Sequence, residues 1–165
     1  MPPNVKEGPR EAPKEGPKEA AVLIACTMNA VRSPMAAALL RHLTRGRLYV
    51  ESAGVRAGAL DPMAVEAMEE IGLEIGKHKP RCFEDVEDGS FDVVITLSPE
   101  AQHKAVELTR TAATQVEYWP TQDPTAVEGS REQRLAAYRA VRDQLMARLK
   151  ARFLAPRAAD ISAGN

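Results

Sequence analysis

The chain has 165 residues, of which 44% are hydrophobic, and this length and composition suit one globular domain with a single core. Its 22 Lys and Arg residues nearly balance its 23 Asp and Glu residues, so the net charge gives no reason to expect nucleic acid or an anionic membrane as a partner. Two widely separated cysteines, Cys26 and Cys82, exclude a disulfide scaffold, and no stretch has the roughly 20 apolar residues that span a bilayer. We therefore expect a cytoplasmic protein in which a free thiol can act as a nucleophile.

The predicted elements alternate between strands and helices. Residues 1–19 repeat Pro, Gly, Glu and Lys without apolar periodicity and are predicted to form a disordered tail, as are residues 155–165. The domain is predicted to span residues 20–154. The predicted strands cover residues 21–25, 48–52, 92–97 and 116–119, and the predicted helices cover 33–44, 62–71, 99–109 and 131–153. This alternation predicts an α/β three-layer sandwich with a four-stranded parallel sheet.

Two helix starts carry capping signals. Ser98 precedes Pro99, which suits the first helical position, and Ser130 is followed three residues later by Gln133, as in a capping box. Within the last predicted helix, apolar residues recur every three or four positions, which predicts one face packed on the sheet.

The segment with a chemical signature joins the first strand to the first helix. It reads Cys26-Thr27-Met28-Asn29-Ala30-Val31-Arg32, and Ser33 and Pro34 open the helix. Unpaired N–H groups at such a turn converge on one point and, with the helix dipole, form an oxyanion-binding nest. The dipole and Arg32 would stabilise a thiolate at Cys26, and the guanidinium would clamp two oxygens of a phosphoryl group. We expect residues 27–33 to bind substrate, although a buried structural cysteine would also suit this strand end.

The run Val22–Ala36 resembles the low-molecular-weight protein tyrosine phosphatases and the arsenate reductases that share their fold. The resemblance extends in order over roughly residues 21 to 153. The further matching segments are Ser52-Ala53-Gly54, Pro62-Met63-Ala64-Val65-Glu66-Ala67-Met68, His78-Lys79-Pro80-Arg81, Asp92-Val93-Val94-Ile95-Thr96-Leu97 and Asp123-Pro124.

The resemblance implies a covalent phosphatase mechanism. Cys26 would attack phosphorus, Arg32 would hold the phosphoryl oxygens, and Ser33 would donate its hydroxyl to the thiolate. Asp-Pro is by itself a common turn pair, but the resemblance implies that Asp123 protonates the leaving oxygen and later deprotonates the hydrolytic water.

The resemblance also implies a supporting group behind the cradle. Asn29 matches the loop asparagine of the family, which is held by residues that match Ser52 and His78. Asparagine is the non-glycine residue that best tolerates a left-handed backbone.

Two features depart from the family pattern. Met28 stands where the family usually has Gly, and Val31 stands where it usually has a second Cys. The segments 55–60 and 125–128 contain none of the aromatic residues that line the pocket of phosphotyrosine-specific members, so a preference for phosphotyrosine loses its physical basis.

The sequence thus predicts phosphomonoester hydrolysis through a cysteinyl-phosphate intermediate. The substrate would be a phosphorylated protein or a small phosphomonoester. We expect neither a cofactor nor a metal, because His42, His78 and His103 lack ligand spacing. The sequence does not indicate an oligomeric state.

Two alternatives remain open. The first is an arsenate reductase that uses Cys26 with an external thiol. Thioredoxin-coupled reductases of this fold need two further cysteines, one directly after the third strand, where this chain has Ser98. Cys82, beside Phe83, is predicted to be a half-buried loop cysteine. The second alternative is a phosphate-binding module without catalysis, although pure binding would need neither a thiol nor an acid.

Overall fold

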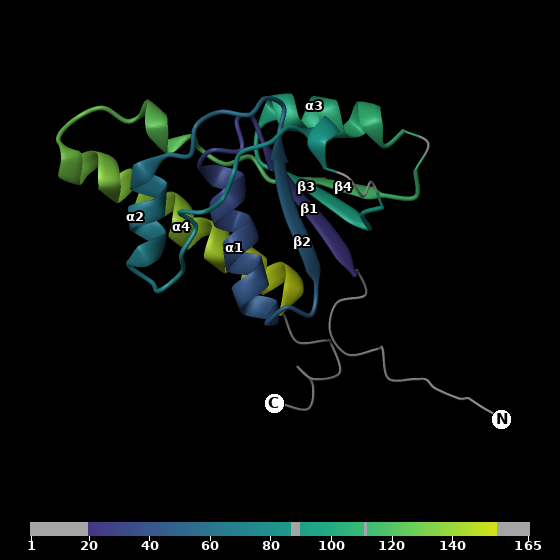
Figure 1. Ribbon diagram of the computed structural model, residues 1–165, viewed down its shortest axis with the longest axis horizontal. Helices are drawn as coiled ribbons and strands as arrows, with labels where there is room; N and C mark the ends of the chain where they lie inside the picture. Colours follow the sequence, from purple (N-terminus) through teal and green to yellow (C-terminus); the bar gives the residue numbers. More distant parts are fainter. Residues whose placement is uncertain (1–19, 87–89, 111, 155–165) are drawn as a thin grey trace.

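The computed structural model describes residues 20–86, 90–110 and 112–154, which form an α/β fold (Figure 1). The predicted tails, residues 1–19 and 155–165, lie outside the described residues. In chain order the elements are β1 (Ala21–Cys26), α1 (Arg32–Thr44), β2 (Tyr49–Gly54), α2 (Pro62–Glu69), the 3-10 turn η2 (Phe83–Asp85), β3 (Val93–Thr96), α3 (Pro99–Leu108), β4 (Gln115–Tyr118), the 3-10 turn η3 (Pro124–Ala126) and α4 (Arg131–Phe153).

The four strands form one parallel sheet in the order β2-β1-β3-β4, which confirms the predicted fold class. In the register of the sheet, Ile24 of β1 lies between Ser52 of β2 and Ile95 of β3. The strand order reverses between β1 and β3, because the chain passes from β2 at one edge back across β1. Open α/β sheets bind ligands at the carboxyl ends of the strands at such a reversal, and β1 ends there at Cys26.

Helices cover both faces of the sheet (Figure 1). Helices α1, α2 and α4 lie on one face, where Ile24 and Ile95 are fully buried in the larger core. Helix α3 lies on the opposite face, where Leu23 and Val94 pack against Ala101 and Ala105. Because both faces are covered, β1 is a nearly continuous apolar strand and does not alternate between apolar and polar residues.

The ends of the elements follow local capping chemistry. Ser98 caps α3, and Ser130 with Gln133 forms a capping box at the start of α4, as the sequence predicted. Helix α2 ends two residues before the predicted end, since Gly72 with a φ of 82° turns the chain away. The other predicted ends coincide with the observed ends or differ from them by at most two residues.

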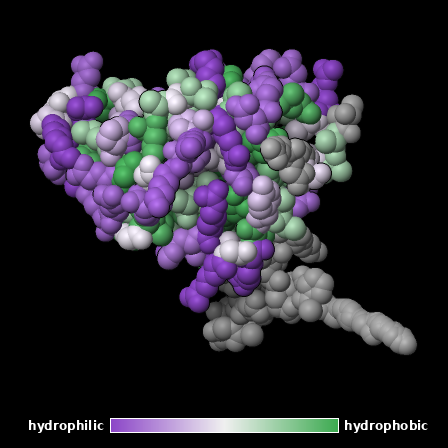
Figure 2. All heavy atoms as spheres, in the orientation of Figure 1, coloured by the Kyte–Doolittle hydropathy of each residue, from purple (hydrophilic) through white to green (hydrophobic). Residues whose placement is uncertain are grey.

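Most of the face seen in Figure 2 is hydrophilic, with hydrophobic side chains scattered between the polar ones. Among the described residues, no helix is long and apolar enough to cross a membrane.

Candidate active site

The loop between β1 and α1 holds its backbone N–H groups free of protein partners. Among the described residues, the N–H groups of residues 27–32 donate no hydrogen bond to another protein group. Helices α2, α3 and α4 have side-chain caps, whereas Val31, the N-cap residue of α1, provides none. Unpaired donors at a helix start attract anions, because the N–H groups and the helix dipole both favour negative charge.

The segment 55–61 turns the carbonyl groups of the loop away from this point. Four of its N–H groups donate to four loop carbonyls at 2.9–3.2 Å, which leaves the loop amides to face the other way. The donor and acceptor pairs are Val55 with Cys26, Arg56 with Thr27, Gly58 with Met28, and Asp61 with Ala30. The cradle is therefore built by two segments, of which the sequence analysis had considered the second only as a wall of the pocket.

The thiol of Cys26 lies at the base of the cradle and is 2% exposed. Its Sγ is 2.9 Å from the hydroxyl oxygen of Ser33. That oxygen accepts a hydrogen bond from the Asn29 amide at 2.9 Å and lies 3.4 Å from the carbonyl oxygen of Ala53, so its one hydrogen points either to the sulfur, which is nearer, or to that carbonyl.

Asn29 links the cradle to the supporting group that the sequence predicted. Its φ is 53°, in the left-handed region. The amide nitrogen also donates to Ser52 at 2.9 Å, while Oδ1 accepts from the Arg81 N–H at 2.9 Å and lies 3.0 Å from His78 Nε2. Burial lowers the pKa of His78, so the neutral ring, with its hydrogen on Nε2, can donate to Asn29.

Arg32 and Asp123 meet beside the thiol. Arg32 is 8% exposed and donates from Nη1 to the carbonyl of Thr121 at 2.9 Å. Its Nη2 lies 3.9 Å from Asp123 Oδ2. Asp123 Oδ1 accepts from the backbone N–H and the hydroxyl of Thr125 at 3.0 and 2.8 Å, so the carboxylate is fixed at the start of η3. The structure thus brings Cys26, Arg32 and Asp123 to one site.

These groups line a cavity of about 170 Å³. Cys26 and Arg32 reach it from the cradle, while the side chains of Thr27, Asn29 and Ser33 bond elsewhere. No aromatic residue lines the cavity among the described residues. The other lining residues are Met28, Ala30, Val31, Gly58, Ala59, Asp61, Asp123 and Thr125.

Asp61 is the lining residue with an ionisable side chain that the sequence analysis missed. It precedes Pro62 and caps α2, just as Asp123 precedes Pro124 and caps η3. The repeated Asp-Pro pair was a signal that could have revealed it.

Cys82 lies outside the cavity. The register pairs Cys26 with Gly54 and Gly54 with Cys82, and neighbouring strands lie about 4.8 Å apart, so the two cysteine Cα atoms are separated by about 10 Å. A disulfide requires less than about 7 Å. The Cys82 thiol donates to Asp85 at 3.1 Å, and this hydrogen bond raises the pKa of Cys82.

Ser98 follows β3 and is 2% exposed. Its oxygen accepts from the Thr27 hydroxyl at 2.9 Å and from the N–H of Ala101 at 3.3 Å. The position after β3, where the resemblance to thioredoxin-coupled reductases predicted a cysteine, is therefore occupied by a helix cap.

A thiol and an arginine at the two ends of an uncapped strand-to-helix loop define a class of protein: α/β proteins with a cysteine-based oxyanion site. The chain belongs to the low molecular weight phosphotyrosine protein phosphatase family, whose model matches residues 21–158.

The relatives of the chain within this fold include arsenate reductases. An arsenate reductase of Shouchella clausii is 35% identical over 78% of the chain and 91% of its own length. A glutaredoxin arsenate reductase of Synechocystis sp. is 30% identical over 78% of the chain and 92% of its own length. A solved arsenate reductase in the phosphate binding state matches with a TM-score of 0.61 and 29% identity, over 79% of this chain and 93% of that one.

Proposed function

We propose that the chain is an arsenate reductase in which Cys26 attacks arsenate and thiols from outside the chain supply the two electrons. The observation that carries the proposal is the cradle of unpaired amides around Cys26 and Arg32, which suits a small tetrahedral oxyanion. The bare walls of the cavity suit a substrate without an organic group. The relatives named arsenate reductases support arsenate as that oxyanion.

The proposed reaction balances in three steps. The Cys26 thiolate forms a bond to arsenic and displaces hydroxide, which leaves as water with a proton from Asp123. An external thiolate then attacks the Cys26 sulfur, so that a disulfide bond forms and the sulfur–arsenic bond breaks with its electron pair on arsenic. Arsenic(V) is thereby reduced to arsenite. A second external thiol releases Cys26, and the two thiols leave as one disulfide.

The thiols are external because no second thiol of the described residues lies within disulfide distance of Cys26. Cys82 is separated by about 10 Å along a hydrogen-bonded register, and Ser98 replaces the cysteine expected after β3. The Synechocystis relative is a glutaredoxin arsenate reductase, and this supports a separate thiol protein as the electron donor.

A second candidate is phosphomonoester hydrolysis, with a phosphorylated protein or a small phosphomonoester as substrate. Two observations favour it. Asp123 lies beside Arg32 at 3.9 Å, where an acid can protonate a leaving oxygen. Cys26 is 2% exposed, so water, which is smaller than a thiol, more easily reaches an intermediate on its sulfur.

A side-by-side assay separates the two reactions. The purified chain is incubated with arsenate and a monothiol, and separately with an aryl phosphate, and arsenite and phosphate are measured. We expect one arsenite for each disulfide formed, in the wild type and in Cys82→Ser alike, and none in Cys26→Ser.

If Cys82→Ser no longer reduces arsenate, Cys82 itself acts as the second thiol, and the proposal of an external thiol is wrong. Phosphate release without arsenite would select hydrolysis. If a folded chain forms neither arsenite nor phosphate, the site only binds an oxyanion.

A further inference from the structure

The rim of the cavity is acidic. Of its lining residues, Cys26 and Arg32 carry ionisable groups at the base, and Asp61 and Asp123 carry them at the rim. Arg32 is 8% exposed and is fixed by the Thr121 carbonyl at 2.9 Å, so its guanidinium faces the cradle. Once an oxyanion is bound to Arg32, a further group next to that oxyanion has the carboxylates of Asp61 and Asp123 as its nearest charged neighbours.

Asp61 is held in place by neutral donors. Its Oδ1 accepts from the N–H of Met63 at 2.8 Å, and its Oδ2 accepts from the hydroxyl of Tyr138 at 2.6 Å. Its own N–H donates to the carbonyl of Ala30 at 3.2 Å, which ties it to the cradle. Among the described residues Asp61 forms no ion pair, so no cation is bound directly to its carboxylate.

Tyr138 is hydrogen-bonded to Asp61 and feels the charges of both carboxylates. It is 2% exposed, and its pKa is raised by burial, by the hydrogen bond to Asp61, and by the charges of Asp61 and Asp123. The phenol therefore stays neutral and donates its hydrogen bond. Arg134 is the cation whose charge acts on Tyr138 in the opposite direction, but it does not line the cavity.

We propose that Asp61, together with Asp123, selects a positively charged group beside the reacting oxyanion. The group is an ammonium or a guanidinium. It would be carried by the external thiol in arsenate reduction or by the leaving group in hydrolysis, so the inference rests on the site of the proposed function. A capping role alone would not need a charge, since Asn caps a helix as well as Asp does.

The first experimental arm measures arsenate reduction with three thiols of similar size. Cysteamine is cationic, 2-mercaptoethanol is neutral and 3-mercaptopropionate is anionic, and each rate is divided by the thiolate concentration. We expect the rates to fall in that order, by about threefold to tenfold per step at low salt. The differences should shrink in 1 M salt, where the Debye length is about 3 Å.

The second arm uses aryl phosphates with a cationic, a neutral or an anionic substituent and matched phenol pKa values. If the hydrolysis rates fall from the cationic to the anionic substituent and no arsenite is formed, the cation belongs to the leaving group. If the arsenate reduction rates follow the charge of the thiol and no phosphate is released, the cation belongs to the thiol.

The third arm does not depend on turnover. Cys26→Ser is titrated by calorimetry with aminomethylphosphonate, ethylphosphonate and phosphonoacetate, which differ in the charge next to the phosphonate. Tighter binding of the cationic compound supports the inference even if neither reaction is catalysed, whereas equal affinities would overturn it.

Matched variants assign the effect to Asp61. Asp61→Asn keeps a capping side chain but loses the charge. Within each series, the rates or affinities of this variant should differ by no more than about twofold. Glu66→Gln is the control. The Glu66 carboxylate lies on the same helix, pairs with Arg131 and does not line the cavity, so this variant should retain the full order of rates and affinities. An unchanged order in a folded Asp61→Asn would contradict the assignment, with folding checked by Tm.

Discussion

At the scale of single residues, the shape of the cradle depends on close contacts that only particular side chains permit. Asn29 adopts a φ of 53° and uses both ends of its amide, so the loop can turn while Ser33 stays beside the thiol. Gly54 lies directly behind this turn. A Cβ atom there would lie 2.5 Å from the Arg56 carbonyl oxygen and 2.7 Å from the Asn29 nitrogen. The cradle and the segment 55–61 can approach each other because Gly54 has no side chain.

Gly54→Ala is therefore expected to destabilise the fold and distort the oxyanion site. Its Cβ would meet backbone atoms, which cannot rotate away, so the cost should reach or exceed the upper end of about 1–3 kcal/mol for overpacking. Urea denaturation gives the free energy of unfolding, and titration with phosphate gives the affinity of the site.

Gly76→Ala is the matched control, because its nearest neighbour is the flexible Glu74 carboxylate at 2.9 Å. It should change the free energy of unfolding by less than about 0.5 kcal/mol. Equal effects of the two substitutions would mean that the close approach at Gly54 is not rigid.

Asp123→Asn tests the carboxylate beside Arg32. If Asp123 protonates the leaving oxygen, the variant should lose about 10²–10⁴-fold in kcat/KM for phenyl phosphate and much less for a nitrophenyl ester. The measurement is kcat/KM against the phenol pKa for both proteins. Parallel lines would show that Asp123 only fixes the turn at Thr125.

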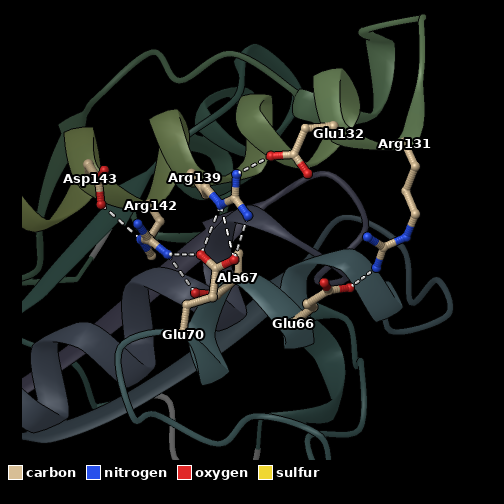
Figure 3. A network of polar contacts seen from close by, with 8 residues as sticks. All are labelled: Glu66, Ala67, Glu70, Arg131, Glu132, Arg139, Arg142 and Asp143. Carbon is tan, nitrogen blue, oxygen red and sulfur yellow. Dashed lines mark hydrogen bonds and ion pairs between the residues drawn. The ribbon is translucent and has the colours of Figure 1, made fainter.

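At the scale of secondary structure elements, α2 and α4 are joined by charged side chains (Figure 3). Glu70, just after α2, accepts hydrogen bonds from Arg139 and Arg142 of α4. Arg142 also donates to the carbonyl of Ala67 at 2.7 Å, one of the carbonyls that a helix end leaves without a partner. The network holds α2, and with it Asp61, against the helix that follows Asp123.

This network predicts a specific dependence of stability on pH. The hydrogen bond from Arg139, then that from Arg142, lowers the pKa of Glu70 from 4.5 to about 2. Because the folded-state pKa is the lower one, Glu70 stabilises the fold above pH 4.5, and this contribution is lost as the pH falls toward about 2.

Glu70→Gln should therefore be less stable than the wild type at pH 7, and the difference should disappear between pH 4.5 and about 2. Denaturant titrations at several pH values measure it. Glu69→Gln is the control, because the Glu69 side chain forms no ion pair among the described residues. A pH-independent difference for Glu70→Gln would contradict the role of its charge.

At the scale of the whole molecule, the strands and helices of the described residues run from Ala21 to Phe153, and residues 1–19 have the composition of a tail without a core. Deletion of residues 1–19 is therefore expected to keep activity and to change Tm by less than about 2 °C, which for this size corresponds to less than about 1 kcal/mol. Differential scanning calorimetry and the assays above measure the effect.

The cut must leave Ala20 in place. The N–H groups of Ala20 and Ala21 donate to the Asp92 carboxylate at 2.8 and 2.9 Å, and Ala21 pairs with Tyr49. Deletion of residues 1–21 should therefore lower Tm by several degrees more than deletion of residues 1–19. A large loss from the shorter deletion would show that the composition of the tail was misread.

The sequence by itself determined the local features of this protein. Strand–helix alternation predicted the parallel sheet, since apolar runs and amphipathic periods arise within short segments. Capping signals at Ser98 and Ser130 marked helix starts for the same reason. The spacing of Cys26 and Arg32 within one loop predicted a cradle, and the family resemblance pointed to Asp123.

Only the tertiary structure decided which distant segments complete the site. Three contacts join residues up to 77 positions apart: the pairing of segment 55–61 with the cradle, the acidic rim formed by Asp61 beside Asp123, and the hydrogen bond from Tyr138 to Asp61. The separation of Cys82 from Cys26 likewise follows from the register of the sheet. Such contacts depend on how strands align and how helices pack, and neither leaves a period or a cap in the sequence that could predict it.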